Sequence, residues 1–165
     1  MPSRAIVLIG PMGVGKTTIG RKLAKSLKLD FIDTDTTVVR SHGPIDKLFS
    51  SLGEAKFREL ETDALRQALD AAPCVIATGG GVVTTSANLD LLQEAVVFYL
   101  ATDGRHIGNR LRNGNRPLIR NGMEDWNRIY EQRRHLYEHA ANHIIDTSGV
   151  PLSTTVSDIK EKLAI

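Results

Sequence analysis

The sequence predicts an α/β fold built on a five-stranded parallel sheet with helices on both faces. Five short apolar runs alternate with longer segments of helical periodicity, and a glycine-rich loop follows the first run. This alternation is typical of strand–helix–strand crossovers, which join parallel strands. The expected strands are residues 5–9, 30–33, 74–77, 96–100 and 143–146.

Four segments carry apolar residues at helical spacing, which predicts a buried face on each. The expected helices are residues 17–27, 54–70, 125–141 and 151–163. No repeat, linker or low-complexity tract interrupts this pattern, so residues 1–165 are expected to form one domain. A polar stretch rich in Asn and Gly, residues 113–124, predicts a mobile lid-like loop.

The composition is that of a globular protein whose ligands are small anions. Hydrophobic residues make up 41% of the chain, and the net charge of +2 is too small to indicate nucleic-acid binding. Eight arginines and no lysine lie between Arg105 and Arg134, and the planar guanidinium group suits phosphates and carboxylates. The lone Cys74 lies in an apolar run and is expected to be a buried thiol. With no signal peptide and no run of membrane-spanning length, we expect a cytoplasmic protein.

Residues 10–17, GPMGVGKT, match the phosphate-binding pattern G-x-x-x-x-G-K-[ST] between an expected strand and an expected helix. The glycines let backbone N–H groups turn toward phosphates, Lys16 neutralises the β- and γ-phosphate charge, and the Thr17 hydroxyl binds magnesium. The residues expected to bind ATP here are Gly13, Val14, Gly15, Lys16, Thr17 and Thr18. The expected cofactor is therefore Mg²⁺, bound with ATP.

Asp33 and Asp35 lie where the second strand is expected to end, and strand alternation would point both carboxylates to one face. One could hold magnesium and the other could accept a proton from an attacking hydroxyl. Helix capping explains the same residues equally well, and this alternative stays open.

The third expected strand ends in residues 77–81, ATGGG, and carries no acid there. Many phosphate-loop proteins hold the metal with an acid at such a position, so its absence assigns the metal to Thr17 and Asp33. The three glycines would let a ligand approach the backbone closely, or they form only a flexible turn.

Arginines form the second group of candidates. Arg133 lies on the apolar stripe of the helix at 125–141, where it needs a counter-anion, and we favour a ligand carboxylate over a structural acid. Arg58 and Glu61 are three residues apart on one helix and would pair, although such pairs are commonly solvated. Arg116, in the expected lid, would close over the phosphates and stabilise the transferred charge.

In their order and spacing, these motifs resemble the shikimate kinase family along nearly the whole chain. The matching segments are GPMGVGKTT at 10–18, FIDTD at 31–35, GPI at 43–45, GEAKFRELE at 53–61, GGG at 79–81, RPL at 116–118 and RRHLY at 133–137. The resemblance implies a three-layer P-loop nucleotide-kinase-like fold. It also implies transfer of the γ-phosphoryl group of ATP to the 3-hydroxyl of shikimate, in aromatic amino-acid biosynthesis.

The resemblance also implies a role for each matching residue. Asp35 would bind substrate hydroxyls and act as the base, and Asp33 would help to hold magnesium. Arg58 and Arg133 would bind the shikimate carboxylate, with Glu61 orienting Arg58. The full substrate-binding set is Asp35, Arg58, Glu61, Gly79, Gly80, Gly81 and Arg133, and the catalytic set is Lys16, Asp35 and Arg116.

Two positions depart from the family pattern. Val39 stands where the family often has an acid. Asn109 stands where an arginine commonly lies beside the adenine, and the next residue, Arg110, is assigned this ATP contact instead.

Two other functions stay open. One is a kinase for another small hydroxylated acid, such as gluconate, because two arginines would serve either carboxylate. The other is a nucleotide-binding protein without kinase activity, against which Asp35 argues, since such a protein needs no base beside the second strand. The expected partners are ATP and shikimate, without nucleic acid or membrane, and the protein is expected to act as a monomer.

Overall fold

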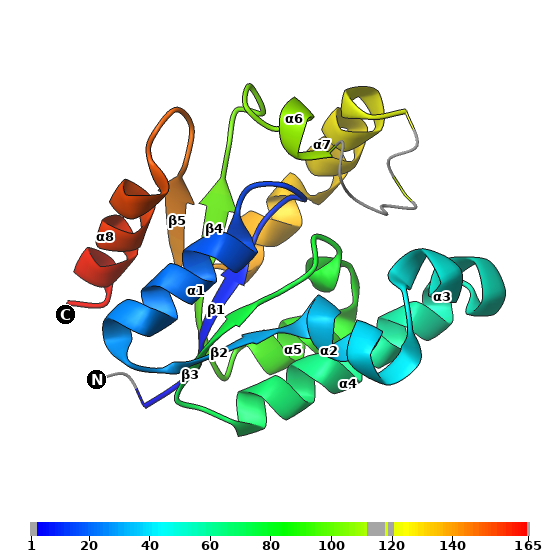
Figure 1. Ribbon diagram of the computed structural model, residues 1–165, viewed down its shortest axis with the longest axis horizontal. Coiled ribbons are helices and arrows are strands. Elements are labelled where there is room, and N and C mark those ends of the chain that lie inside the picture. The colour runs from blue at the N-terminus through cyan, green and yellow to red at the C-terminus, as the bar shows by residue number, and fades with distance from the viewer. Residues whose placement is uncertain (1–2, 112–117, 119–120, 165) are drawn as a thin grey trace.

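The computed structural model describes residues 3–111, 118 and 121–164, and it confirms the predicted fold class (Figure 1). Within these residues, five strands form one parallel sheet in the order β2-β3-β1-β4-β5. The strands are β1 (Ile6–Ile9), β2 (Asp30–Asp33), β3 (Cys74–Ala77), β4 (Val96–Ala101) and β5 (His143–Asp146). Each predicted strand is present, β1 one residue shorter and β4 one residue longer than expected.

Helices cover both faces of the sheet. They are α1 (Lys16–Leu27), α2 (Thr34–His42), α3 (Ile45–Leu52), α4 (Glu54–Asp70), α5 (Ser86–Leu92), α6 (Gly108–Leu111), α7 (Met123–Ala140) and α8 (Leu152–Lys162), with a 3-10 turn, η1, at Val82–Thr84. In Figure 1, α1 and α8 lie on one side of the sheet and α4, α5 and α7 on the other. The result is the predicted three-layer arrangement.

The central strand β1 is wholly apolar because it is buried on both faces. Ile6 and Leu8 pack toward α1 and α8, whereas Val7 and Ile9 pack toward α4 and α7. Cys74 on β3 is fully buried, as predicted, and burial raises the pKa of its thiol. These buried strands hold the loops at their carboxyl ends in fixed positions.

Helices α2 and α3 were not predicted from the sequence. Segment α2, TDTTVVRSH, is mostly polar and buries only Thr34 and Val38, so it lacks a clear apolar stripe. Val38 joins Leu48 of α3 and Phe57 of α4 in a small separate core. Figure 1 shows α2 and α3 past the carboxyl end of β2, and both helices contribute to one wall of the candidate site.

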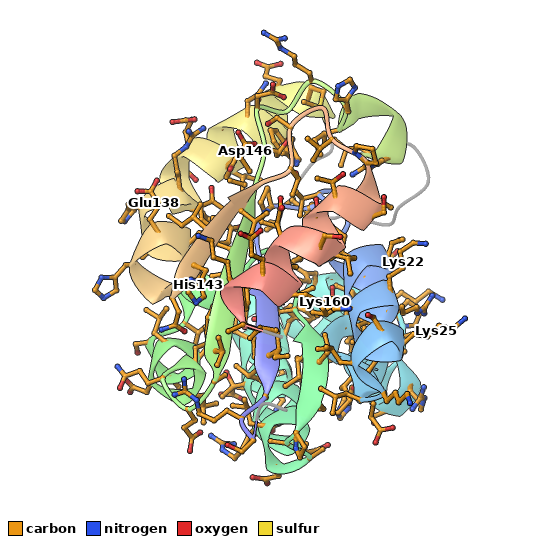
Figure 2. All side chains as sticks on the ribbon, turned by 90° about the vertical axis from the view of Figure 1, so that its left-hand side faces the viewer. Lys22, Lys25, Glu138, His143, Asp146 and Lys160 are labelled. Carbon is orange, nitrogen blue, oxygen red and sulfur yellow. The ribbon has the colours of Figure 1, made fainter. Side chains whose placement is uncertain are left out.

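The opposite edge of the sheet is β5, shown with its side chains in Figure 2. His143 and Asp146 mark the two ends of this strand, and Glu138 lies on the neighbouring α7. On the α8 side, Lys160 donates a hydrogen bond to Ser26 Oγ of α1 at 2.7 Å. This bond ties the last helix to the first.

The loop predicted at 113–124 is shorter than expected at its carboxyl end. Met123 and Glu124 form the first turn of α7, where the acidic Glu124 and Asp125 favour a helix start. Residues 113–117 and 119–120, which include most of the predicted lid, lie outside the described residues. Among the helices that the structure describes, none is long and apolar enough to cross a bilayer.

Candidate functional site

The predicted site residues gather at the carboxyl ends of β1, β2 and β3, where parallel sheets commonly bind ligands. They line two adjoining pockets with volumes of about 280 Å³ and about 110 Å³. The larger, which we call the nucleotide pocket, lies on the glycine-rich loop after β1. The smaller, which we call the acceptor pocket, lies toward α3 and α4. Both pockets share Met12, Asp35, Gly79 and Gly80, so ligands in the two would meet there.

The nucleotide pocket is built on the turn from β1 into α1. Gly15 begins α1 with a φ of 107°, a left-handed conformation that side chains rarely adopt, which explains the glycine. Lys16 is buried, and its ammonium group donates to the carbonyls of Gly10 at 2.6 Å and Pro11 at 2.9 Å. A positive charge is thus held against a glycine-rich loop that leads into the N-terminus of a helix, an arrangement suited to phosphate binding.

Thr17 and Asp33 meet across the same pocket. The Thr17 hydroxyl donates to Asp33 Oδ2 at 2.6 Å, and the other carboxylate oxygen accepts the Thr36 N–H at 3.2 Å. Asp33 is therefore the N-cap of α2, as one of the two interpretations predicted, and its other carboxylate oxygen still faces Thr17 of the phosphate loop, so capping does not exclude the metal role. A hydroxyl beside a carboxylate is an oxygen donor set of the kind that Mg²⁺ prefers.

Asp35 lies at the predicted site, but on a helix rather than on the predicted strand face. The second strand ends at Asp33, and Asp35 lies in the first turn of α2, so the expected strand alternation was wrong. Its carboxylate lies over Gly79: a Cβ atom there would stand 2.8 Å from Asp35 Oδ1. The helix turn, rather than the strand, brings this carboxylate to the boundary of the two pockets.

Arg58 and Glu61 form a buried pair on α4. Arg58 Nη1 lies 3.1 Å from Glu61 Oε1, and Glu61 is only 1% exposed, so this is not a solvated surface pair. Arg58 also contacts the exposed Glu54 at 3.3 Å. Its Nε is buried without a hydrogen-bond partner in the described part of the chain. The guanidinium is thus oriented by carboxylates on one side and faces the acceptor pocket on the other.

The charge on Glu61 is costly in this setting. Burial raises its pKa from 4.5 to about 7, an effect that Arg58 opposes and that the negative charge of Asp35 reinforces. Between these pH values the folded protein keeps a proton that the unfolded chain has lost. The contribution of Glu61 to stability is therefore present at low pH and is lost as the pH rises through about 7.

This titration predicts a measurable pH dependence of unfolding. In urea titrations at pH 5 and pH 8, the loss of unfolding free energy on going to pH 8 should be smaller in Glu61→Gln than in wild type by about 3 kcal/mol. Glu59→Gln, which removes an exposed carboxylate of the same helix, should behave like wild type. Equal pH dependence in wild type and Glu61→Gln would show that Glu61 does not carry this raised pKa.

Arg133 is 9% exposed on α7 and lines the acceptor pocket, whereas Arg134 next to it points outward. Within the described residues, no carboxylate lies within 4 Å of Arg133. Its Nη1 would stand 3.6 Å from a Cβ atom at Gly80. Arg133 therefore makes no direct ion pair among these residues, although its charge acts on nearby Glu61 and lowers the pKa of that carboxyl, and the predicted alternative, a ligand anion, is supported.

The segment Gly79, Gly80 and Gly81, called the triglycine segment below, forms the floor between the two arginines. A Cβ atom at Gly81 would overlap the guanidinium of Arg58, which explains why this position has no side chain. In the described part of the chain, the N–H groups of these three glycines donate to no protein acceptor. They are free donors at the edge of the acceptor pocket.

The apolar wall of the acceptor pocket was missed by the sequence analysis. It comes from Ile45, Phe49, Phe57 and Leu118, and the rings of Phe49 and Phe57 lie 4.9 Å apart. The apolar spacing of residues 45, 48, 49 and 52 is a helical signal that could have identified α3. A wall of this kind favours an apolar ring opposite the charged groups.

Arg110 and Arg116 were both predicted to contact ATP, and the structure places only the first of them. Arg110 lies against the phosphate loop, donates to the Gly13 carbonyl at 2.8 Å and lines the nucleotide pocket. Arg116 lies outside the described residues. Trp126, in the first turns of α7, is buried behind the phosphate loop, and its indole N–H donates to the Met12 carbonyl at 2.8 Å.

The chain is similar to shikimate kinases in both sequence and structure. The shikimate kinase family model matches residues 12–164. A shikimate kinase of Streptomyces coelicolor is 41% identical over 152 residues, covering 90% of this chain and 89% of that protein. One of Pseudomonas entomophila is 38% identical over 165 residues, covering 97% and 96%. The solved structure of shikimate kinase from Acinetobacter baumannii in complex with shikimate superposes with a TM-score of 0.92 at 35% identity, covering 98% of this chain and 93% of that one.

Proposed function

The chain belongs to the shikimate kinase family, and from this premise we propose how its own residues perform the reaction. The activity is the ATP-dependent transfer of a γ-phosphoryl group to the 3-hydroxyl of shikimate, giving shikimate 3-phosphate and ADP in aromatic amino-acid biosynthesis. One observation supports the residue assignment above all: a phosphate-binding pocket and an arginine-lined pocket adjoin at a single carboxylate, that of Asp35.

ATP binds with its phosphates on the loop at residues 10–18. The ammonium of Lys16 exchanges its contacts with the loop carbonyls for the β- and γ-phosphate oxygens, a stronger interaction because both partners are charged. Val14 and Thr18 complete the loop and the first turn of α1, and Gly13 and Gly15 allow the backbone to approach. Arg110 stands over this loop from α6 and contacts the nucleotide.

Thr17 and Asp33 would hold the magnesium ion that accompanies ATP. Their oxygens already face each other at 2.6 Å within the nucleotide pocket. When bound, the ion neutralises phosphate charge that would otherwise repel the attacking oxygen. The third strand is followed by Thr78 and three glycines rather than by an acid, which favours Thr17 and Asp33 as the donors.

Shikimate binds in the acceptor pocket with its carboxylate between the guanidinium groups of Arg58 and Arg133. Glu61 orients Arg58, and the triglycine segment supplies N–H donors for the remaining polar atoms. The ring packs against the apolar wall formed by α3 and α4. An open-chain hydroxylated acid such as gluconate would place hydroxyl groups against that wall, at a cost in desolvation.

Asp35 accepts the proton of the attacking hydroxyl. Its carboxylate is the acidic group shared by both pockets, where the acceptor oxygen and the γ-phosphate must meet. Holding the two reactants in line makes the step effectively intramolecular, and Lys16 stabilises the charge on the transferred group. Arg116 would add a second positive charge from a lid that ends before α7 begins at Met123.

We propose that the protein acts as a monomer. The free, buried thiol of Cys74 supports a reducing compartment, the cytoplasm. We also propose that residues 1–165 form a single kinase domain. Neither nucleic acid nor membrane is part of the proposed function.

A substrate panel tests this function. With ATP and Mg²⁺ in a coupled ADP assay, kcat/KM for shikimate should exceed that for gluconate by at least about a hundredfold, because the pocket matches a ring carboxylate. Incubation without acceptor serves as the control for hydrolysis. Comparable rates for the two acids would contradict the substrate assignment, and ATP binding without turnover of any acid would favour a non-catalytic protein.

A further inference from the structure

We propose that the hydroxyl group of Tyr137 is a positioning group for the acceptor site, because it fixes the orientation of the triglycine backbone against which shikimate binds. The inference rests on the proposed function, which assigns the acceptor pocket to shikimate. Tyr137 itself does not line that pocket. It acts through the peptide group that joins Gly80 to Gly81.

The contact that carries this role is a buried hydrogen bond. The Tyr137 hydroxyl donates to the Gly80 carbonyl at 2.5 Å, and the side chain is fully buried. Its ring stacks on Tyr99 with centroids 5.1 Å apart and lies 6.2 Å from Tyr130. Burial raises the pKa of Tyr137 to about 12, so the hydroxyl keeps its proton and remains a donor throughout the pH range of an assay.

The middle carbonyl of the triglycine segment depends on this donor. The turn itself supplies partners for the other two: Val82 N–H donates to Gly79 at 3.2 Å and Thr84 N–H to Gly81 at 3.0 Å. In the described part of the chain, no backbone N–H donates to the Gly80 carbonyl. Without Tyr137 this carbonyl would be buried and unsatisfied, and glycines on both sides would let the peptide rotate.

Peptide geometry carries the effect into the pocket. In a planar trans peptide the C=O and the following N–H point in opposite directions. Holding the Gly80 carbonyl toward α7 therefore aims the Gly81 N–H away from α7, on the side of Arg58, whose guanidinium lies against Gly81. This N–H is one of the donors that lack a protein acceptor among the described residues.

Helix α7 links the same contact to Arg133. Residues four apart lie on one helix face, so Arg133 and Tyr137 project together, and the positive charge of Arg133 acts on the Tyr137 hydroxyl by lowering its pKa. One helical turn thus sets the position of a guanidinium relative to the triglycine peptide. The phosphate loop has its own anchor, Trp126, so loss of the Tyr137 hydroxyl should affect the acceptor side more than the nucleotide side.

The test is Tyr137→Phe in the full chain, with Tyr130→Phe as the matched control. Tyr130 belongs to the same aromatic cluster, and its hydroxyl pairs with that of Tyr99 and accepts the Thr102 N–H, but it does not contact the triglycine segment. Both variants remove one buried hydroxyl. We expect KM for shikimate to rise about threefold to tenfold in Tyr137→Phe, with kcat and KM for ATP within about twofold of wild type. In Tyr130→Phe all three constants should stay within about twofold.

Melting temperatures of both variants separate positioning from folding. Similar small decreases, with KM for shikimate raised in Tyr137→Phe alone, support the proposal. An unchanged KM for shikimate, an equal rise for both substrates, the same rise in Tyr130→Phe, or a Tyr137→Phe protein that fails to fold would each overturn it. Lack of shikimate turnover by the wild-type enzyme would instead contradict the proposed function.

Discussion

Replacing Asp35 by asparagine is expected to lower kcat about a thousandfold while leaving the affinity for ATP within a few-fold of wild type. The side chain keeps its size and its place in the first turn of α2, but the amide oxygen is a far weaker base than a carboxylate. The hydroxyl of the acceptor then attacks with its proton still attached. Steady-state kinetics with shikimate, together with ATP titration by calorimetry, measure the two effects separately.

The control for Asp35→Asn is Asp30→Asn. Asp30 begins β2 at the opposite end of the strand, is exposed, and lines neither pocket. The Asp30→Asn substitution removes the same charge, and this variant should retain the wild-type kcat. A kcat near wild type in Asp35→Asn would remove Asp35 as the base and assign proton transfer to another group.

Replacing Arg133 by glutamine has the second largest expected effect, a fall in kcat/KM for shikimate of about a hundredfold to a thousandfold. The change removes a charged partner of the substrate carboxylate within a partly desolvated pocket, and leaves that carboxylate under-compensated. Because the contact is to the non-reacting end of shikimate, most of the loss should appear in KM. Initial-rate kinetics with both substrates varied distinguish KM from kcat.

Arg134→Gln is the control for this prediction. Arg134 follows Arg133 directly, but it lies outside the pocket, pairs with Glu131 and packs over the Tyr130 ring at 4.7 Å. It should keep wild-type KM values for both substrates. An equal loss in the two variants would attribute the effect of Arg133→Gln to helix α7 as a whole, and a wild-type KM in Arg133→Gln would contradict its contact with the carboxylate.

The sheet could be predicted because β1, β3 and β4 are apolar runs buried between helices, and because the edge strands β2 and β5 each keep two adjacent apolar residues. The four predicted helices also followed from apolar faces. Helix α2 could not be predicted in the same way, since its sequence TDTTVVRSH is polar and one face only touches a small core. Short helices that pack at an edge depend on tertiary contacts more than on periodicity.

The residues of the candidate site could also be predicted only in part. Arg133 was identified because a charged side chain on an otherwise apolar helix stripe needs a counter-anion. Such a mismatch is visible in the sequence. Asp35 was identified with a wrong geometric reason, because the end of β2 and the start of α2 are indistinguishable in the sequence. The contact of Tyr137 with Gly80 spans 57 positions and could not be predicted, since nothing local to either residue marks it.

In the proposed function, shikimate lies between the two arginines and Asp35. The most direct measurement is a crystal structure of the enzyme with Mg²⁺, a non-hydrolysable ATP analogue and shikimate. The carboxylate should lie within hydrogen-bond distance of both Arg58 and Arg133, with the 3-hydroxyl facing Asp35 and the γ-phosphate position beyond it. Shikimate bound in the reverse orientation, or outside the acceptor pocket, would contradict the proposed roles of Arg58, Arg133 and Asp35.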